Sequence, residues 1–200
     1  MFDVDGVLLD SIRAYRRAWH VWADEYRVSE DAIWSTAHGR RPIDISRLNA
    51  PWVSEQAALR RIEELIDTEY AQVPAMSGAR DLLRRIPGRW AVVTSGSRAV
   101  VQRAFRRLDL PEPPAGVYGA DVATGKPHPA CYQLAAQRLK LNPRDCVVVE
   151  DAPSGVTAGK AAGMAVIAVT STHTLEQLLQ ADLVVSSLHE VPEAVSRLTG

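Results

Sequence analysis

The chain of 200 residues carries 23 basic and 24 acidic side chains and has a formal net charge of −1. This length suffices for one hydrophobic core with a sizeable insertion, and it argues against two large independent domains. Because no stretch concentrates charge of one sign, the composition argues against a nucleic-acid or membrane-surface partner. The expected partner is a small molecule.

The cysteines and the first residues of the chain indicate the cellular compartment in which the protein is expected. Cys131 and Cys146 form no CxxC pattern, so we expect neither a zinc site nor a disulfide framework. The opening MFDVDG lacks the basic flank and apolar run of a signal peptide, and no later apolar run is long enough to span a bilayer. These features predict a soluble protein in a reducing cytoplasm.

Residues 2–4 predict a first strand, and the apolar residues of 12–80 then recur at helical spacing. One stripe of such residues consists of Tyr15, Trp19, Trp22 and Tyr26. A second helix is predicted to begin at the capping Ser54 and to carry Ala58, Ile62, Leu65, Ile66 and Tyr70. We therefore predict a helical insertion over 12–80 and a core formed by 1–11 and 81–200.

From residue 89 onward, apolar runs alternate with helical segments. The runs WAVVT (90–94), CVVVE (146–150), MAVIAV (164–169) and DLVVS (182–186) are continuous, as in parallel strands buried on both faces. The segments SRAVVQRAFRRLDL, HPACYQLAAQRLKL and SGVTAGKAAG predict crossover helices, the last ending at Gly163. This order predicts a doubly wound, parallel α/β sheet.

Acidic residues follow two of the predicted strands, at the sheet edge where ligands bind in such folds. Asp3 and Asp5 lie two residues apart before Gly6, and Glu150 with Asp151 ends a buried strand. A divalent cation would keep neighbouring buried carboxylates ionised. Each segment alone is equally explained as an acidic turn or a helix cap.

Two further segments offer groups that bind phosphate. In VVTSGS, Thr94, Ser95 and the first amides of a helix would cradle phosphate oxygens, although Ser97 alone is explained as a helix cap. In ATGKPHP, Lys126 lies in a loop stiffened by prolines, and its compact ammonium suits a carboxylate and a phosphate together.

Together FDVDGVLLDS, VVTSGS, GKPHP and VVVEDAPSGVTAGKAAGM resemble the four ordered motifs of the haloacid dehalogenase-like phosphotransferases, over nearly the whole chain. The residues within these motifs are similar to those of the subgroup of sugar- and polyol-phosphate phosphatases. The β-phosphoglucomutases are related but less similar. The resemblance implies a Rossmann-like core with a helical cap inserted after the first strand, and a Mg²⁺-dependent phosphatase acting on a small phosphorylated metabolite.

By this resemblance, Asp3 is the nucleophile that becomes an aspartyl phosphate and Asp5 is the general acid and base. Mg²⁺ would be held by the Asp3 carboxylate, the Asp5 carbonyl and Asp151, with Glu150 assisting directly or through water. The catalytic set is completed by groups that bind the phosphoryl oxygens: Thr94, the Ser95 amide and Lys126.

The resemblance also places substrate contacts in the cap. It implies that AHGRR at 37–41 faces the pocket, so His38, Arg40 and Arg41 are candidate contacts, with Asp10 and Ser11 as further candidates at the hinge. A solvated cap surface is the alternative for each. The cap tryptophans, which are Trp19, Trp22 and Trp34, are expected in the core.

Other activities are weighed against hydrolysis. A mutase of the β-phosphoglucomutase type stays open, although those enzymes carry a histidine where this chain has Tyr15. A dehalogenase would need neither Asp5 nor a metal, and a phosphonatase would need a cap lysine that 12–80 lacks. A non-catalytic binding module is the remaining alternative, although Asp3, Asp5, Lys126 and Asp151 are all present.

Only Met1 and Phe2 precede Asp3, whereas relatives of this kind lead into that acid with a fuller apolar strand. A central strand usually has about five or six residues. We therefore expect the natural start to lie upstream of Met1.

Overall fold

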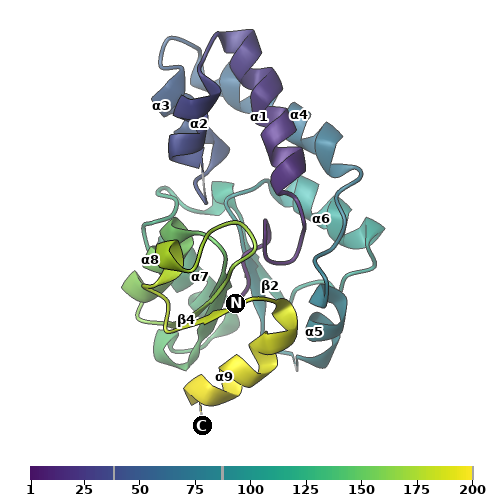
Figure 1. Cartoon of the computed structure of the whole chain (residues 1–200), viewed down its shortest axis with the longest axis vertical. Coiled ribbons are helices and arrows are strands. Elements are labelled where there is room, and N and C mark those ends of the chain that lie inside the picture. The colour runs from purple at the N-terminus through teal and green to yellow at the C-terminus, as the bar shows by residue number, and fades with distance from the viewer. Residues whose placement is uncertain (38, 87, 200) are drawn as a thin grey trace.

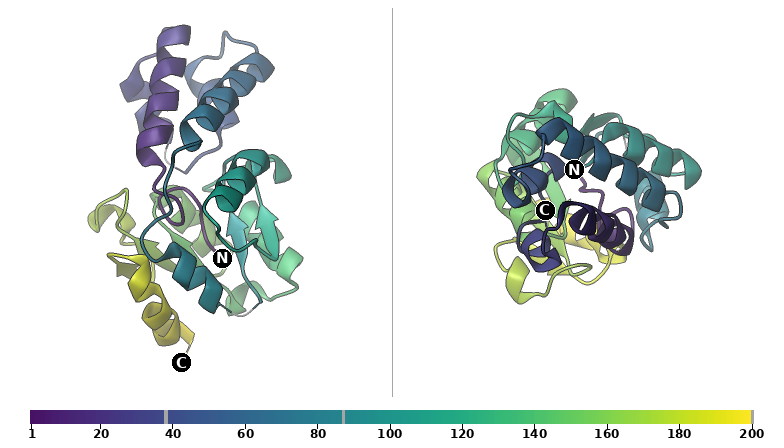
Figure 2. Two further views of the ribbon diagram at one scale, coloured as in Figure 1. Left: turned by 90° about the vertical axis from the view of Figure 1, so that its right-hand side faces the viewer. Right: turned by 90° about the horizontal axis from the view of Figure 1, so that it is seen from above.

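The computed structural model describes residues 1–37, 39–86 and 88–199 and has two stacked parts. A group of helices stands at one end, and a parallel sheet flanked by helices forms the other (Figure 1). The C-terminal helix lies at the end of the molecule opposite that helical group (Figure 2). This arrangement confirms the doubly wound α/β sheet that the apolar runs predict.

The first residues join two halves of the sheet. The Phe2 amide donates to the Ala91 carbonyl at 2.9 Å on one side, while the Asp3 amide donates to the Val149 carbonyl at 3.0 Å on the other. Phe2 forms parallel bridges to both Val92 and Val149. The segment before Asp3 is therefore the central strand, as predicted, although it pairs over very few residues.

The remaining strands are parallel and pair as β1 with β2 and as β3, β4 and β5 in order. Their bounds are β1 Ala91–Val93, β2 Ala115–Val117, β3 Val147–Glu150, β4 Ala165–Val169 and β5 Leu183–Val185. All but β2 lie within the predicted runs. The sequence AGV of β2 gives no strand signal, because it is short and lacks a run of β-branched residues.

Apolar residues cover both faces of the sheet, which explains why the strands are apolar throughout. One face packs against α7 and α8, with Val93 and Val148 buried there. The other, with Val92 and Val149, packs with residues of α5, α6 and α9. The bounds are α5 Ala79–Arg85, α6 Arg98–Arg107, α7 Ala130–Leu139, α8 Pro153–Ala161 and α9 Val191–Thr199.

In the described part of the chain, four helices come between the first strand and α5, which confirms the inserted cap. They are α1 Ile12–Tyr26, α2 Glu30–Ala37, α3 Pro42–Asn49 and α4 Glu55–Tyr70. The longest two, α1 and α4, pack together and carry the predicted stripes, whereas the short α2 and α3 were not predicted. Trp19 and Trp22 are fully buried between these helices, as expected.

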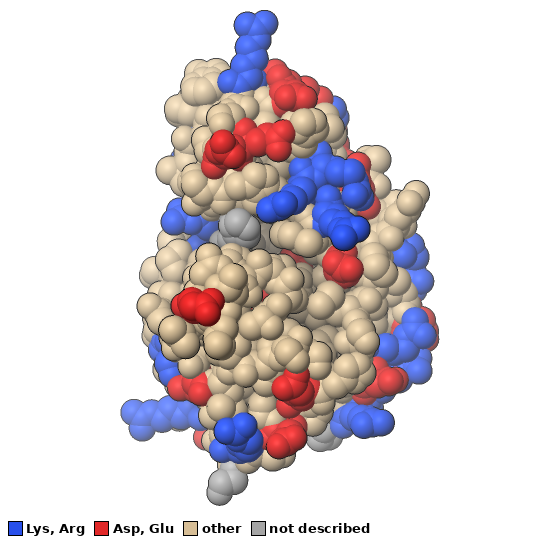
Figure 3. Space-filling view, in the orientation of Figure 1, with Lys and Arg blue, Asp and Glu red and all other residues tan. Residues whose placement is uncertain are grey.

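The surface shows basic and acidic side chains interspersed on the face drawn in Figure 3. This mixture fits the nearly balanced composition. Among the helices of the described residues, none is long and apolar enough to cross a membrane.

The packing of the cap can be tested by replacing Trp22. It has no exposed surface, and its Nε1 donates to the Ala58 carbonyl at 3.2 Å. Trp22→Ala should lower the free energy of unfolding by about 3–5 kcal/mol, because it empties a large buried volume. Trp52→Ala, at a side chain that is 68% exposed, should change it by less than about 0.5 kcal/mol. Equal effects in urea denaturation would contradict this packing.

Candidate active site

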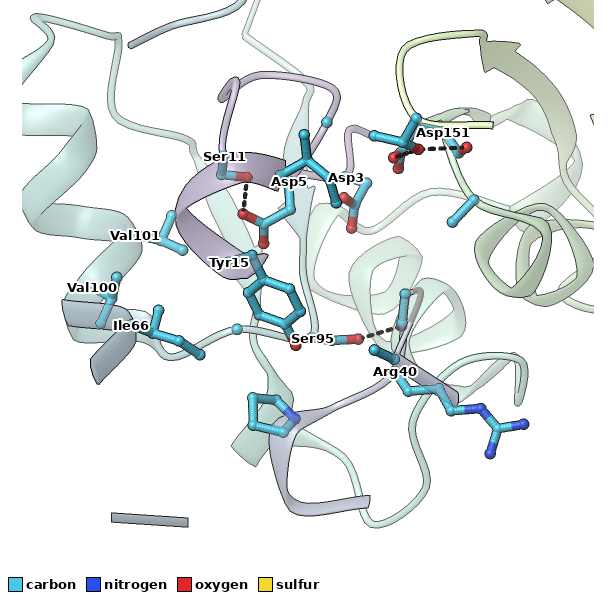
Figure 4. Close-up of a pocket in the computed structure, with 18 of the residues that line it drawn as sticks. Asp3, Asp5, Ser11, Tyr15, Arg40, Ile66, Ser95, Val100, Val101 and Asp151 are labelled. Carbon is cyan, nitrogen blue, oxygen red and sulfur yellow. Dashed lines mark hydrogen bonds between the residues drawn. The ribbon is translucent and has the colours of Figure 1, made fainter. Parts of the chain in front are cut away.

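A pocket opens at the carboxyl edge of the sheet, beneath the cap. Asp3 and Asp5 line it from the first strand and the turn after it, Ser95 from the end of β1, and Asp151 from the end of β3 (Figure 4). The empty space at this site amounts to about 870 Å³, a volume that includes open solvent at its mouth. Three of the four predicted acids, Asp3, Asp5 and Asp151, therefore line one cavity.

A tight turn at residues 4–9 brings Asp5 beside Asp3. The Gly6 amide donates to the Leu9 carbonyl at 2.9 Å, and Gly6 has a φ of +79°. A Cβ at Gly6 would lie 2.3 Å from Oδ2 of Asp151. Only glycine therefore gives this turn both its backbone conformation and its close approach to the second acidic segment.

Lys126 ties the acidic segments together from below. Its ammonium donates to Oδ1 of Asp3 at 2.5 Å, to Oε1 of Glu150 at 2.6 Å and to the Val93 carbonyl at 3.1 Å. All three donors of this ammonium are thus used, as the burial of Lys126 requires, since the residue is only 4% exposed. The sequence predicts that Lys126 balances a carboxylate and a phosphate, and in the structure its ammonium lies on two carboxylates, those of Asp3 and Glu150.

Glu150 is fully occupied by donors. Its Oε1 accepts from Lys126 and, at 2.9 Å, from the Tyr132 hydroxyl, while its Oε2 accepts from the amides of Asp151 at 2.9 Å and Ala152 at 3.1 Å. These bonds lower the pKa of Glu150 against the opposing effect of burial, with Lys126 the largest favourable cause. Glu150 therefore holds Lys126 and the loop after β3 in place.

A divalent cation would fit among the acids Asp3, Glu150 and Asp151. Oxygens of Asp3, Glu150 and Asp151 all lie within 4.8 Å of one another. Three carboxylates against the one ammonium of Lys126 leave two negative charges unbalanced when all are ionised. Carboxylate oxygens are the ligands that Mg²⁺ prefers, and the single ammonium of Lys126 does not neutralise all three acids.

The pKa values express this excess of negative charge. Burial, with the neighbouring Glu150 and Asp5, raises the pKa of Asp3 to about 8 despite Lys126. Burial and the charges of Glu150 and Asp3 also raise the pKa of Asp151 well above its ordinary value. Burial alone would lower the pKa of Lys126, but Asp3 and Glu150 raise it well above its usual range. The acids thus need a cation to ionise together, and the lysine stays charged.

Asp5 is surrounded by hydroxyl groups. Its Oδ1 accepts from Ser11 Oγ at 2.6 Å and from the Tyr70 hydroxyl. Burial raises the pKa of Asp5, and these donors with Thr94 only partly oppose that rise. A carboxyl group with a raised pKa suits a residue that both gives and takes a proton near neutral pH.

The groups after β1 lie where the sequence predicts them, with one difference. The buried Thr94 accepts from the Gly96 amide at 3.0 Å, and Ser95 lines the pocket. However, the Ser95 hydroxyl donates to the Gly39 carbonyl of the cap at 2.8 Å. Its side chain therefore links cap and core, which leaves its amide for the predicted phosphate contact.

Of the substrate contacts predicted in the cap, the structure places some at the pocket and others elsewhere. His38 lies outside the described residues. Arg40 lines the pocket, but its guanidinium is directed away from Asp3 and Asp5 in Figure 4.

Arg41 and Asp10 do not line the pocket, contrary to the prediction. The Arg41 guanidinium pairs with Asp44 at 2.6 Å and donates to the Val122 carbonyl at 2.7 Å, so it fastens the cap to the core. Asp10 is exposed, and its amide donates to the Pro74 carbonyl at 3.0 Å in the chain that returns from the cap.

Sequence reasoning also missed pocket residues. Tyr70 was assigned only to an apolar stripe, yet its buried hydroxyl reaches Asp5. Trp34 was expected in the core, but it is only partly buried and lines the pocket beside Tyr15. Helical spacing placed these residues on an inward face, and it did not show that this face meets a cavity.

Comparison with known proteins decides the family. The model of the haloacid dehalogenase-like hydrolases matches residues 1–163. The chain belongs to the haloacid dehalogenase-like hydrolase family. Hexitol phosphatase A of Escherichia coli is 40% identical over 96% of this chain and 91% of its own length. Glycerol-1-phosphate phosphohydrolase 2 of Saccharomyces cerevisiae is 32% identical over 95% and 82%.

Solved structures agree with this family. The β-phosphoglucomutase of Clostridium difficile superposes with a TM-score of 0.87 over 98% of this chain and 94% of its own, at 20% identity, which shows a shared fold alone. The family model and the curated relatives confirm the resemblance to the haloacid dehalogenase-like enzymes. They also confirm the enzyme class: the chain is a hydrolase of this family, with phosphatases among its relatives.

The buried acids of this haloacid dehalogenase-like hydrolase predict how pH and metal affect stability. Between the ordinary pKa of 3.8 and the raised value of about 8, folded Asp3 holds a proton that the unfolded chain has lost. The free energy of unfolding in EDTA should therefore fall as pH rises through this range. Mg²⁺ should therefore raise Tm more at pH 8 than at pH 5. At 100 times its Kd, a bound ion raises the free energy of unfolding by about 2.7 kcal/mol.

The measurement is thermal unfolding with Mg²⁺ and with EDTA at both pH values. Asp151→Asn should reduce the gain from Mg²⁺, because it removes one of the oxygens not neutralised by Lys126. A gain that is the same at both pH values and in this variant would contradict a metal site at the acids.

Tyr70→Phe should slow hydrolysis of an aryl phosphate with little change in Tm. The variant removes one donor from Asp5, and a hydrogen bond to a charged group is worth about 1.5–3 kcal/mol, or about 10- to 100-fold in kcat. Tyr26→Phe, in the neighbouring α1, is the matched control because Tyr26 does not line the pocket. An unchanged kcat for Tyr70→Phe would show that its hydroxyl does not position Asp5.

Proposed function

We propose that this chain is a Mg²⁺-dependent phosphatase that hydrolyses the phosphomonoester of a small sugar or polyol through an aspartyl phosphate on Asp3. The observation that carries the proposal is the position of Asp3. Its carboxylate lines the pocket, is held by Lys126 at 2.5 Å and has Asp5 beside it. The hexitol and glycerol phosphatases among its relatives support the class of substrate.

The nucleophile in this proposal is the free oxygen of Asp3. Because Lys126 binds Oδ1, Oδ2 remains to attack phosphorus, and the Asp3–phosphate bond forms as the ester bond breaks. Lys126 offsets negative charge without leaving its place. Thr94 and the Ser95 amide stand at the same edge of the sheet, where they can donate to the phosphoryl oxygens.

Asp5 moves the protons. In its protonated form it gives a proton to the departing alkoxide, and in its ionised form it accepts one from the water that attacks the aspartyl phosphate. The hydroxyls of Ser11 and Tyr70 hold one carboxylate oxygen, which leaves the other for these transfers. One residue thus serves both halves of the reaction.

Asp3 and Asp151 are the side chains that would hold Mg²⁺, with the Asp5 carbonyl from the same turn and Glu150 steadying the site from behind. When bound, the ion supplies positive charge that lets an anionic carboxylate approach an anionic phosphate. The unbalanced acids of the site support its presence.

The cap, which we assign to residues 12–80, would cover the leaving group, while residues 1–11 and 81–200 form the core. Side chains of α1, α2 and α4 line the pocket above the acids. Such cover excludes water from the reacting groups and contacts the part of the substrate that differs between esters.

Tyr15 favours hydrolysis over phosphate transfer between positions of one sugar. It occupies the place of the histidine of the β-phosphoglucomutases, packs against Trp19 and Trp34, and has a pKa raised by burial. A phenol of this kind is a poor substitute for a histidine that titrates near neutral pH. We therefore expect free phosphate in the same amount as the alcohol.

The decisive variant is Asp3→Asn, which keeps the shape of the side chain and removes the nucleophile. Phosphate release from an aryl phosphate in Mg²⁺ should fall by at least about 1,000-fold. Asp10→Asn, at an exposed acid that does not line the pocket, is the control and should stay close to wild type. Undiminished release by Asp3→Asn would refute the proposed nucleophile.

A further inference from the structure

A fourth carboxylate faces the pocket, on the cap. Glu63 lies in α4 and lines the pocket with Asp3, Asp5 and Asp151. It is partly buried, and burial is the cause that raises its pKa. Within the described part of the chain, no hydrogen bond or ion pair to Glu63 is found, whereas Glu150 and Asp5 each have several donors. Glu63 is thus an underused acceptor that faces a ligand cavity.

The helix places Glu63 far from the reacting groups. Glu63, Ile66 and Tyr70 follow one another on the face of α4 that lines the pocket. Tyr70 marks the catalytic end, since its hydroxyl donates to Asp5. Seven residues of helix separate the two, which is about 10 Å along the axis. Glu63 therefore lies toward the distal end of the leaving group, away from the phosphate.

Many of the side chains that line the rest of the pocket are apolar. They include the apolar side chains of Ile12, Ile66, Val100 and Val101, three of which are labelled in Figure 4. Arg40 also lines the pocket, but its guanidinium is directed away from the acids there. A hydroxylated leaving group would find in Glu63 a charged acceptor at its far end.

We propose that Glu63 determines specificity, by accepting hydrogen bonds from hydroxyls at the distal end of a neutral, polyhydroxylated leaving group and by excluding a carboxylate there. The inference rests on the proposed phosphatase function and names the substrate class within it. A carboxylate has two oxygens and accepts bonds from two neighbouring hydroxyls. The same charge in a poorly solvated wall repels a second anion.

The test compares two esters that differ only at the far carbon: a hexitol 6-phosphate, which ends in a hydroxymethyl group, and the corresponding hexonate 6-phosphate, which ends in a carboxylate. Wild-type enzyme should favour the hexitol ester by at least about 100-fold in kcat/KM. Glu63→Gln should narrow this ratio by at least about 10-fold, mainly by raising KM for the hexitol ester and lowering KM for the hexonate ester.

Two controls separate specificity from damage. Glu64→Gln makes the same change one residue along α4, where the side chain is exposed and pairs with Arg61 at 3.4 Å, and it should leave the ratio unchanged within about twofold. An aryl phosphate, which has no hydroxyl for Glu63, should be hydrolysed by Glu63→Gln within about threefold of the wild-type rate. That result shows that the phosphoryl-transfer groups are intact.

The outcomes distinguish the two claims. A ratio that Glu63→Gln does not change, or wild-type preference for the hexonate ester, overturns the role of Glu63 while the phosphatase stands. If the wild-type enzyme releases phosphate from neither hexose-derived ester nor the aryl phosphate, both claims fall together. A narrowed ratio with normal aryl phosphate hydrolysis supports the assignment.

Discussion

The buried contact of the Lys126 ammonium with Asp3 and Glu150 is the interaction on which the rest of the site depends. These groups come from three segments that are far apart in the sequence, and the same ammonium also binds the Val93 carbonyl at the end of β1. An isolated charge in such a place would be very costly, so each partner makes the burial of the others possible. The contact therefore fixes the distance between the central strand, β1 and β3 at the edge where the pocket opens.

This arrangement divides the cavity into two regions of different chemistry. The base of the pocket holds closely spaced charges and amides from the sheet edge, whereas the walls contributed by the cap are largely apolar. Charges act more strongly on one another where water is excluded, so apolar cap residues strengthen the electrostatics below them without touching phosphate. Two cap residues also bind the core directly: Arg41 donates to the Val122 carbonyl, and the Gly39 carbonyl accepts from Ser95. The cap that covers the pocket and the charged groups below it are thus held together.

Much of this fold and site was predictable, for identifiable reasons. Strands β1, β3, β4 and β5 are buried on both faces and are therefore continuous apolar runs, and short motifs in the sequence contain Asp3, Lys126 and Asp151. Strand β2 lacks such a run. Arg41 resembled a pocket residue until its pairing with Asp44 and Val122 appeared, because that pairing depends on tertiary contacts. For Tyr70 and Glu63, helical spacing gave the face of α4 but not what lies opposite it.

The pairing of the first strand has a consequence for how the enzyme is made. Phe2 and Asp3 are hydrogen-bonded to Ala91 and Val149, and in the described part of the chain these residues join the two halves of the sheet. During synthesis this segment emerges before either of its neighbours exists and must wait, unpaired, until three quarters of the chain has been translated. Asp3, the nucleophile that we propose, therefore reaches its place only when the sheet is completed. A chain translated only as far as β1 has neither a complete sheet nor the acidic pocket at its edge.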